Sequence, residues 1–167
     1  TAAQRADIAG NNLRRLLGLP GRPPSEDPRW PCGKSGYRVF DIHGHLGLWC
    51  RKYYRDGTAE QMVARMDALG IERFAVSDIV GIGSDYRAGN DRIGEGVAAY
   101  PDRIVGYAAY NPNYESEMAG EMARCFDDLG CSGIKFHCNL HDTSTEAPSY
   151  RLGFRIAQER ACPILCH

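Results

Sequence analysis

The sequence predicts an α/β fold, a partial (β/α)8 TIM barrel in which about five parallel strands carry flanking helices. Apolar segments with strand character start roughly 30 residues apart, which is the length of one strand–helix unit, and helical stripes separate them. Strands that alternate with helices in this way are parallel. An open doubly wound sheet is the alternative. However, HGHLG follows the first strand where that fold places a glycine-rich phosphate loop, so we favour the barrel.

Before the barrel, the sequence predicts an amphipathic helix over residues 1–20 and a proline-rich linker over residues 21–36. Apolar residues recur every three or four positions in the first segment, and Gly18 and Pro20 supply its stop signals. The second segment has several prolines and little apolar content, which is typical of a linker or an extended arm. The barrel is therefore expected to occupy residues 37–167.

The predicted strands are rich in β-branched and aromatic residues and are bounded by turn residues. They cover residues 37–42, 73–80, 104–110, 132–137 and 162–167. In the first strand, Val39, Phe40 and Ile42 do not alternate with polar residues as in a surface strand. We therefore expect this strand to be covered on both faces.

Helices are expected between the strands, and the first has the clearest ends. Thr58 and Gln61 have the spacing of a capping box, and Gly70 supplies a C-terminal stop. The other predicted helices are a shorter one over residues 90–100 and apolar stripes over residues 118–129 and 150–160.

Polar side chains gather where the predicted strands end. His43 and His45 end the first strand, Lys135 and His137 the fourth, and His167 the fifth. The ends of parallel barrel strands converge on one mouth, so we expect these groups to meet there. Imidazoles two residues apart leave the same face of a strand and can share a metal ion. A histidine-rich site suits zinc or a similar divalent ion.

Other polar residues are weaker candidates. Asp41 has the parity of the two histidines and could either orient an imidazole or make a structural hydrogen bond. Lys135 could instead pair with a carboxylate as a structural residue. Asn111 ends the third strand and is a candidate substrate contact, and His141 is expected to be solvated in a polar loop. Isolated cysteines are expected to be packed rather than to bind metal; those near the site are Cys138, Cys162 and Cys166.

Composition limits the partners of the chain. The formal charge is −1, with 20 basic and 21 acidic residues, so neither a nucleic-acid nor a membrane partner is indicated. The seven cysteines are odd in number and scattered, which favours free thiols and a cytoplasmic location. We expect a small-molecule substrate, and leave homo-oligomer formation open.

Four ordered blocks, DIHGHLG, YPDRIVGYAAYNP, GIKFH and CPILCH, resemble the amidohydrolase superfamily, in its amidohydrolase-related branch of metal-dependent hydrolases and decarboxylases. The resemblance implies a distorted (β/α)8 barrel with a divalent ion, usually zinc, at its mouth. The two histidines of the family's first-strand motif correspond to His43 and His45, and its fifth-strand ligand corresponds to His167. The GIK block places Lys135 and His137 near the substrate.

The chain departs from this family in two ways. A further histidine and an aspartate of the family would lie beyond His167, so the chain alone is expected to be an inactive fragment. Residues 1–20 resemble the helix that closes family members at their carboxyl end. A tandem or rearranged gene would explain this position, and an N-terminal arm that packs on the barrel is the alternative.

Three functions are open at this point. The first is a metal-dependent hydrolase, in which metal-activated water attacks a carbonyl, amide or lactone carbon. The second is non-oxidative decarboxylation of a carboxylated aromatic or unsaturated acid, for which Lys135 and Arg51 are candidate carboxylate partners. The third is an inactive fragment or scaffold without metal. A sugar-phosphate barrel that uses no metal is a further alternative.

Overall fold

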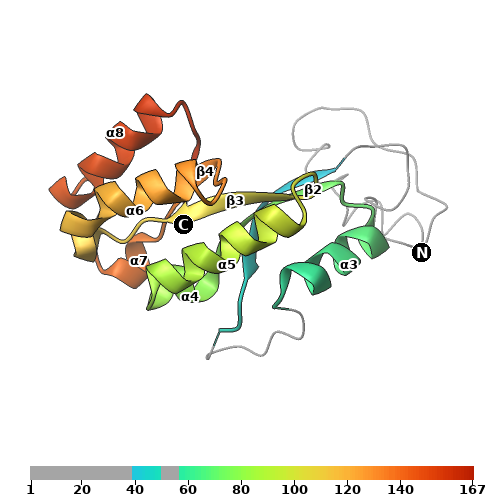
Figure 1. Cartoon of the computed structure of the whole chain (residues 1–167). Helices are drawn as coiled ribbons and strands as arrows, with labels where there is room; N and C mark the ends of the chain where they lie inside the picture. The colour runs from blue at the N-terminus through green and yellow to red at the C-terminus, as the bar shows by residue number, and fades with distance from the viewer. Residues whose placement is uncertain (1–38, 50–56) are drawn as a thin grey trace, which may run out of the picture.

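The computed structural model describes residues 39–49 and 57–167, which form one parallel sheet with helices (Figure 1). The strands are β1 (Phe40–Leu46), β2 (Arg73–Asp78), β3 (Ile104–Ala109), β4 (Gly133–Phe136) and β5 (Ile164–Cys166). Their order in the sheet is β1-β2-β3-β4-β5, and every neighbouring pair is parallel. This order follows the chain, as in part of a barrel, so the predicted partial TIM barrel is confirmed. The predicted helix over residues 1–20 and the linker over 21–36 lie outside the described residues.

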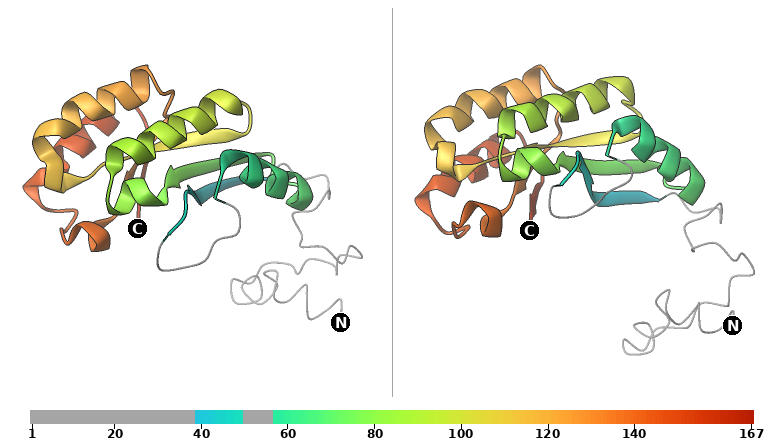
Figure 2. Two further views of the ribbon diagram at one scale, coloured as in Figure 1. Left: turned by 60° about the horizontal axis from the view of Figure 1, so that its bottom comes forward. Right: turned by 90° about the horizontal axis from the view of Figure 1, so that it is seen from below.

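Helices follow the strands in the order that crossovers require. They are α3 (Ala59–Leu69), α4 (Ile79–Gly83), α5 (Tyr86–Ala99), α6 (Glu115–Asp127), α7 (Cys138–His141) and α8 (Arg151–Glu159), with short 3-10 turns η2 (Pro112–Tyr114) and η3 (Pro148–Tyr150). Figure 2 shows α5 and α6 side by side along the sheet. Among the described residues, no helix has the length and apolar character needed to cross a membrane.

Local sequence signals set the ends of α3, as predicted. The Thr58 hydroxyl accepts a hydrogen bond from the Gln61 backbone, and the Gln61 side chain accepts one from the Thr58 backbone, both at 3.2 Å. Gly70 ends the helix with φ of 72°, a left-handed conformation that glycine adopts without a Cβ penalty.

Two predictions about individual elements are wrong. The helix expected over residues 90–100 begins earlier, at Tyr86, because the Asp85 carboxylate accepts a hydrogen bond from the backbone of Ala88 at 3.0 Å. β1 is not covered on both faces in the described part of the chain, since Phe40 is 48% exposed and Ile42 is 59% exposed. β1 also runs on to Leu46, so both histidines lie within the strand.

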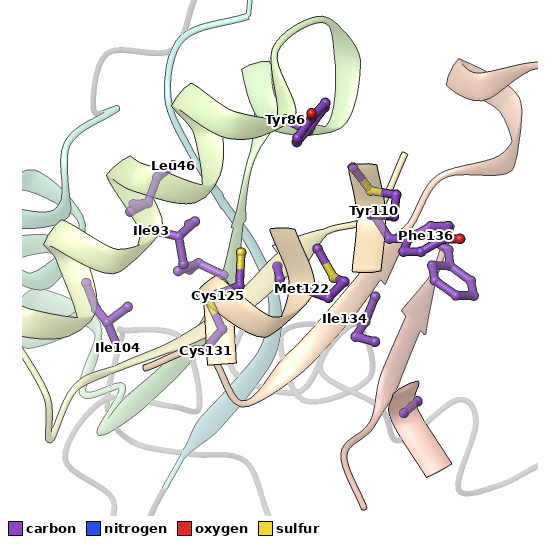
Figure 3. Packing of buried hydrophobic residues seen from close by; sticks show 14 of the residues in the cluster. Leu46, Tyr86, Ile93, Ile104, Tyr110, Met122, Cys125, Cys131, Ile134 and Phe136 are labelled. Atoms are coloured by element: carbon purple, nitrogen blue, oxygen red, sulfur yellow. The ribbon is translucent and has the colours of Figure 1, made fainter. Parts of the chain in front are cut away.

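The core lies between the sheet and the helices that cover it (Figure 3). Ile93 of α5 and Met122 of α6 are fully buried in this core, as are Ile104 and Ile134 of the sheet. A cluster of aromatic rings continues it, formed by Tyr110, Phe136 and Tyr150. Burial of this apolar area is the main contribution that holds the helices on the sheet.

The prediction that His141 is solvated is wrong. Its side chain is buried, and its ring nitrogens lie 3.0 Å from the Tyr150 hydroxyl and 2.9 Å from the Ile82 carbonyl oxygen. These contacts tie α7 to α4 and η3. Burial lowers the pKa of His141 below its ordinary 6.5, because the uncharged ring is favoured there.

Two glycines allow α4 and α5 to touch. A Cβ on Gly89 would lie 2.2 Å from the Cα of Gly81, which is a backbone atom that a rotamer change cannot move. We therefore expect Gly89→Ala to lower the free energy of unfolding by about 1–3 kcal/mol in urea titrations. Gly120→Ala on α6 is the control, because an added Cβ would have no atom within 4 Å of it and the change should be neutral or stabilising. Equal stability of the two variants would contradict the close contact.

The buried His141 should make the fold sensitive to acid. Below pH 6.5 the unfolded chain gains a proton that the folded ring resists, so the free energy of unfolding falls as the pH drops towards the lowered pKa. His141→Gln should cost about 1–3 kcal/mol at pH 7.5 through lost hydrogen bonds, and lose less stability than wild type between pH 7.5 and 5. Tyr150→Phe keeps the imidazole and should retain the wild-type pH dependence. An unchanged pH dependence in His141→Gln would contradict this assignment.

Candidate active site

His43 and His45 come together on β1, with ring centroids 5.2 Å apart in an edge-to-face arrangement. The strand register shifts between Asp41 and Gly44, so β1 has one more residue than β2 across this stretch. Beyond the shift, His45 lies opposite Ser77, and its Nδ1 is 3.1 Å from the Ser77 Oγ. The carboxyl half of β1 therefore presents two imidazoles, one of which is held by a neighbouring strand.

Lys135 of β4 reaches the same place. Its side chain is almost completely buried, and its Nζ lies 3.5 Å from Nε2 of His43. Every ion pair between described residues involves an arginine, so no carboxylate in this part of the chain pairs with Lys135. The alternative of a structural ion pair for Lys135 thus has no support within the described residues. Burial lowers the pKa of Lys135, because the charged form is poorly solvated there.

His137 and His167 meet where β4 and β5 end. Their rings stack with centroids 4.0 Å apart and an interplanar angle of 13°. Nδ1 of His137 accepts a hydrogen bond from the backbone of Leu140 at 3.2 Å, so this imidazole caps α7. The geometry thus brings together two residues that are 30 positions apart in the sequence.

Three of these imidazoles, those of His43, His45 and His137, are uncharged at neutral pH. Burial, reinforced by His43 and Lys135, lowers the pKa of His45 to about 4. Burial and the nearby His167 lower the pKa of His137 to about 4, and burial and Lys135 lower that of His43. An uncharged imidazole has a free lone pair, which is the form that binds a metal ion.

The donor chemistry therefore fits the divalent ion that the resemblance implies. The arrangement fits less completely, because no group of three histidine, cysteine, aspartate or glutamate side chains within residues 39–49 and 57–167 is placed to hold an ion. The ring of His167 stacks on that of His137, and His167 also lies near enough to His43 and His45 to lower their pKa values. The assignment of these three histidines as ligands remains a prediction.

The other expected site residues have more local roles. The Asp41 carboxylate accepts a hydrogen bond from the His43 backbone at 3.1 Å, which is the structural alternative considered for it. The Asn111 side chain is buried and accepts a hydrogen bond from the Asn113 backbone at 3.0 Å, which caps η2. Arg51 lies outside the described residues.

Sequence reasoning missed the contact of Ser77 with His45. The signal available was a small polar residue directly after the apolar run FAV in the strand RFAVSD, but its alignment with His45 depends on the register shift in β1. The neighbouring Asp78 has a structural role instead. It caps α4 through the backbone of Val80 and pairs with Arg92 at 2.7 Å.

Comparison with known proteins agrees with the fold. A putative amidohydrolase from Staphylococcus aureus is 21% identical with a TM-score of 0.63, over 77% of this chain and 46% of that one. A second similar structure is the 5-carboxyvanillate decarboxylase of Novosphingobium aromaticivorans, complexed with manganese and 4-hydroxy-3-methoxy-5-nitrobenzoic acid. It is 17% identical with a TM-score of 0.67, and the match covers 81% of this chain and 51% of the decarboxylase. The 4-oxalomesaconate hydratase of Rhodopseudomonas palustris is 14% identical with a TM-score of 0.59, and the match covers 77% of this chain and 52% of the hydratase.

The chain spans about half the length of these three structures. No curated protein matches it. The family model described as amidohydrolase matches residues 22–167, which is most of the chain and includes every residue of the candidate site. The chain therefore belongs to the amidohydrolase family.

Proposed function

We propose that the protein is a metal-dependent hydrolase that acts on a small molecule bearing a carboxylate. The observation that carries this proposal is the meeting of uncharged imidazoles on β1 with the buried Lys135 of β4. A buried cation without a carboxylate partner in the described part of the chain is suited to bind an anionic substrate.

In this proposal His43, His45 and His167 hold a divalent ion, most simply zinc. When bound, such an ion polarises a carbonyl or carboxylate and lowers the pKa of coordinated water. The uncharged state of His43 and His45 leaves their lone pairs free at neutral pH. Ser77 orients His45 through the contact at Nδ1, which leaves Nε2 of that ring as the nitrogen that can bind the metal ion.

Lys135 and His137 serve the substrate. Lys135 faces the same space as His43 and neutralises a substrate carboxylate, while Arg51 and Asn111 are further proposed contacts. His137 is held in place by its cap to α7, and its stacking on His167 gives the mouth a flat aromatic wall. These residues orient the carbonyl, amide or lactone carbon for attack by water.

Non-oxidative decarboxylation is the second candidate, and Lys135 is the observation that favours it. In that reaction the substrate carboxylate must be held so that its bond to carbon can break, and a buried cation beside the imidazoles can bind and orient it. A similar structure, the 5-carboxyvanillate decarboxylase complexed with manganese, supports the same candidate. The two reactions share one site and differ in product.

The metal assignment can be tested by elemental analysis of the full chain loaded with zinc or manganese. We expect His43→Ala combined with His45→Ala to lower the metal content about tenfold or more, because two donors are lost. His141→Gln removes an imidazole that contacts only protein atoms and should keep wild-type content. Equal metal content in wild type and the double variant would contradict the proposed site, and no metal in either would favour the scaffold without metal.

The role of Lys135 can be tested in the longer protein of which this chain is expected to be a part, with a panel of carboxylated aromatic acids and lactones. Lys135→Met should raise KM for carboxylated substrates about 10- to 100-fold through loss of a charged contact, with a much smaller effect on uncharged esters. Lys135→Arg keeps the charge and should recover part of the binding. Release of carbon dioxide identifies decarboxylation, and its absence during turnover identifies hydrolysis. Equal KM changes for charged and uncharged substrates would contradict the proposed carboxylate contact.

A further inference from the structure

The thiols of Cys138 and Cys166 face each other across the ends of β4 and β5, with their Sγ atoms 3.7 Å apart. Cys138 begins α7 and is half-buried, while Cys166 ends β5 and is exposed, which contradicts the expectation that it is packed. The pairing of Phe136 with Cys166 in the sheet register accounts for their approach, although 28 residues separate the two cysteines. The tertiary fold thus assembles a thiol pair.

We propose that Cys138 and Cys166 form a reversible thiol–disulfide modification site that peroxides oxidise. A disulfide requires a sulfur–sulfur distance of about 2.05 Å, so the two atoms must approach by less than about 2 Å. Side-chain rotation and a small shift of the four-residue helix α7 can supply this movement. The exposed Cys166 gives the oxidant access, in contrast with Cys125 and Cys131, which are both buried.

The chemistry balances with a peroxide as the only co-reactant. The Cys166 thiolate attacks one oxygen of hydrogen peroxide, which breaks the O–O bond and gives a sulfenic acid and hydroxide. The Cys138 thiolate then attacks this sulfur, which forms the S–S bond and expels a second hydroxide. The hydroxides take up the protons that the two thiols released. Two thiols and one peroxide therefore become one disulfide and two waters.

Oxidation would act on the candidate site directly. His137 immediately precedes Cys138, and His167 immediately follows Cys166. Their rings already stack, and a disulfide between the adjacent residues would fix them relative to each other. This inference rests on the positions of the two thiols and does not depend on a bound metal.

The test is peptide mapping of the full chain after treatment with hydrogen peroxide and alkylation of the remaining thiols. The reaction is run near pH 8.5 to increase the thiolate fraction of the two cysteines. Trypsin places Cys138 in the peptide 136–151 and Cys166 in the peptide 161–167, which also contains Cys162. We expect a linked pair of these peptides within one chain, and about a tenfold fall in alkylation of both thiols that dithiothreitol reverses.

Three conservative variants decide whether Cys162 or Cys166, which share one tryptic peptide, forms the link with Cys138. Cys162→Ser should keep the link, whereas Cys138→Ser and Cys166→Ser should each abolish it. A link that is lost in Cys162→Ser and kept in Cys166→Ser would overturn the assignment. So would a link found only between two chains on a non-reducing gel, or a sulfinic acid on Cys166 without any linked peptide. Circular dichroism of each variant before oxidation shows whether it has kept the wild-type fold.

Discussion

The parallel pairing of neighbouring strands is the constraint on which the rest of the structure depends. Because β1 to β5 pair in chain order, their carboxyl ends lie along one edge, and side chains far apart in the sequence meet there. The distance of 3.5 Å between Lys135 and His43 spans 92 residues of sequence. The same pairing brings His137 to His167 and Cys138 to Cys166, so the candidate site and the thiol pair have one origin.

Burial gives this edge its electrostatic character. Lys135 is buried and His45 and His137 are half-buried, while His43 is exposed but partly desolvated beside Lys135, so the charged forms of these groups are disfavoured and their pKa values fall. Neighbouring positive groups lower the pKa values of the imidazoles further. A cluster of this kind contributes little to folding stability, because polar groups carry a desolvation cost that their few hydrogen bonds only partly offset. It is better suited to bind an anionic or metallic ligand.

Much of the architecture could be predicted from the sequence, because strands and helices leave local periodic patterns. The capping box of Thr58 and the stop at Gly70 are contained within a few residues, and the structure has both. The predicted start of α5 is four residues late because its first turn, YRAG, has no apolar stripe and depends on the Asp85 cap. The short helices α4 and α7 escape prediction, since helices of five and four residues contain too few positions to show a period.

By itself, the sequence determined the fold class, the order of the strands and the family, since each is encoded in local pattern or in ordered motifs. It also singled out His43, His45, Lys135, His137 and His167. Only the tertiary structure decided how these groups meet, because their contacts depend on strand register and on packing between distant segments. The shift in β1 that aligns His45 with Ser77, and the burial of His141 beneath Tyr150, follow from such contacts and leave no periodic signal in the chain.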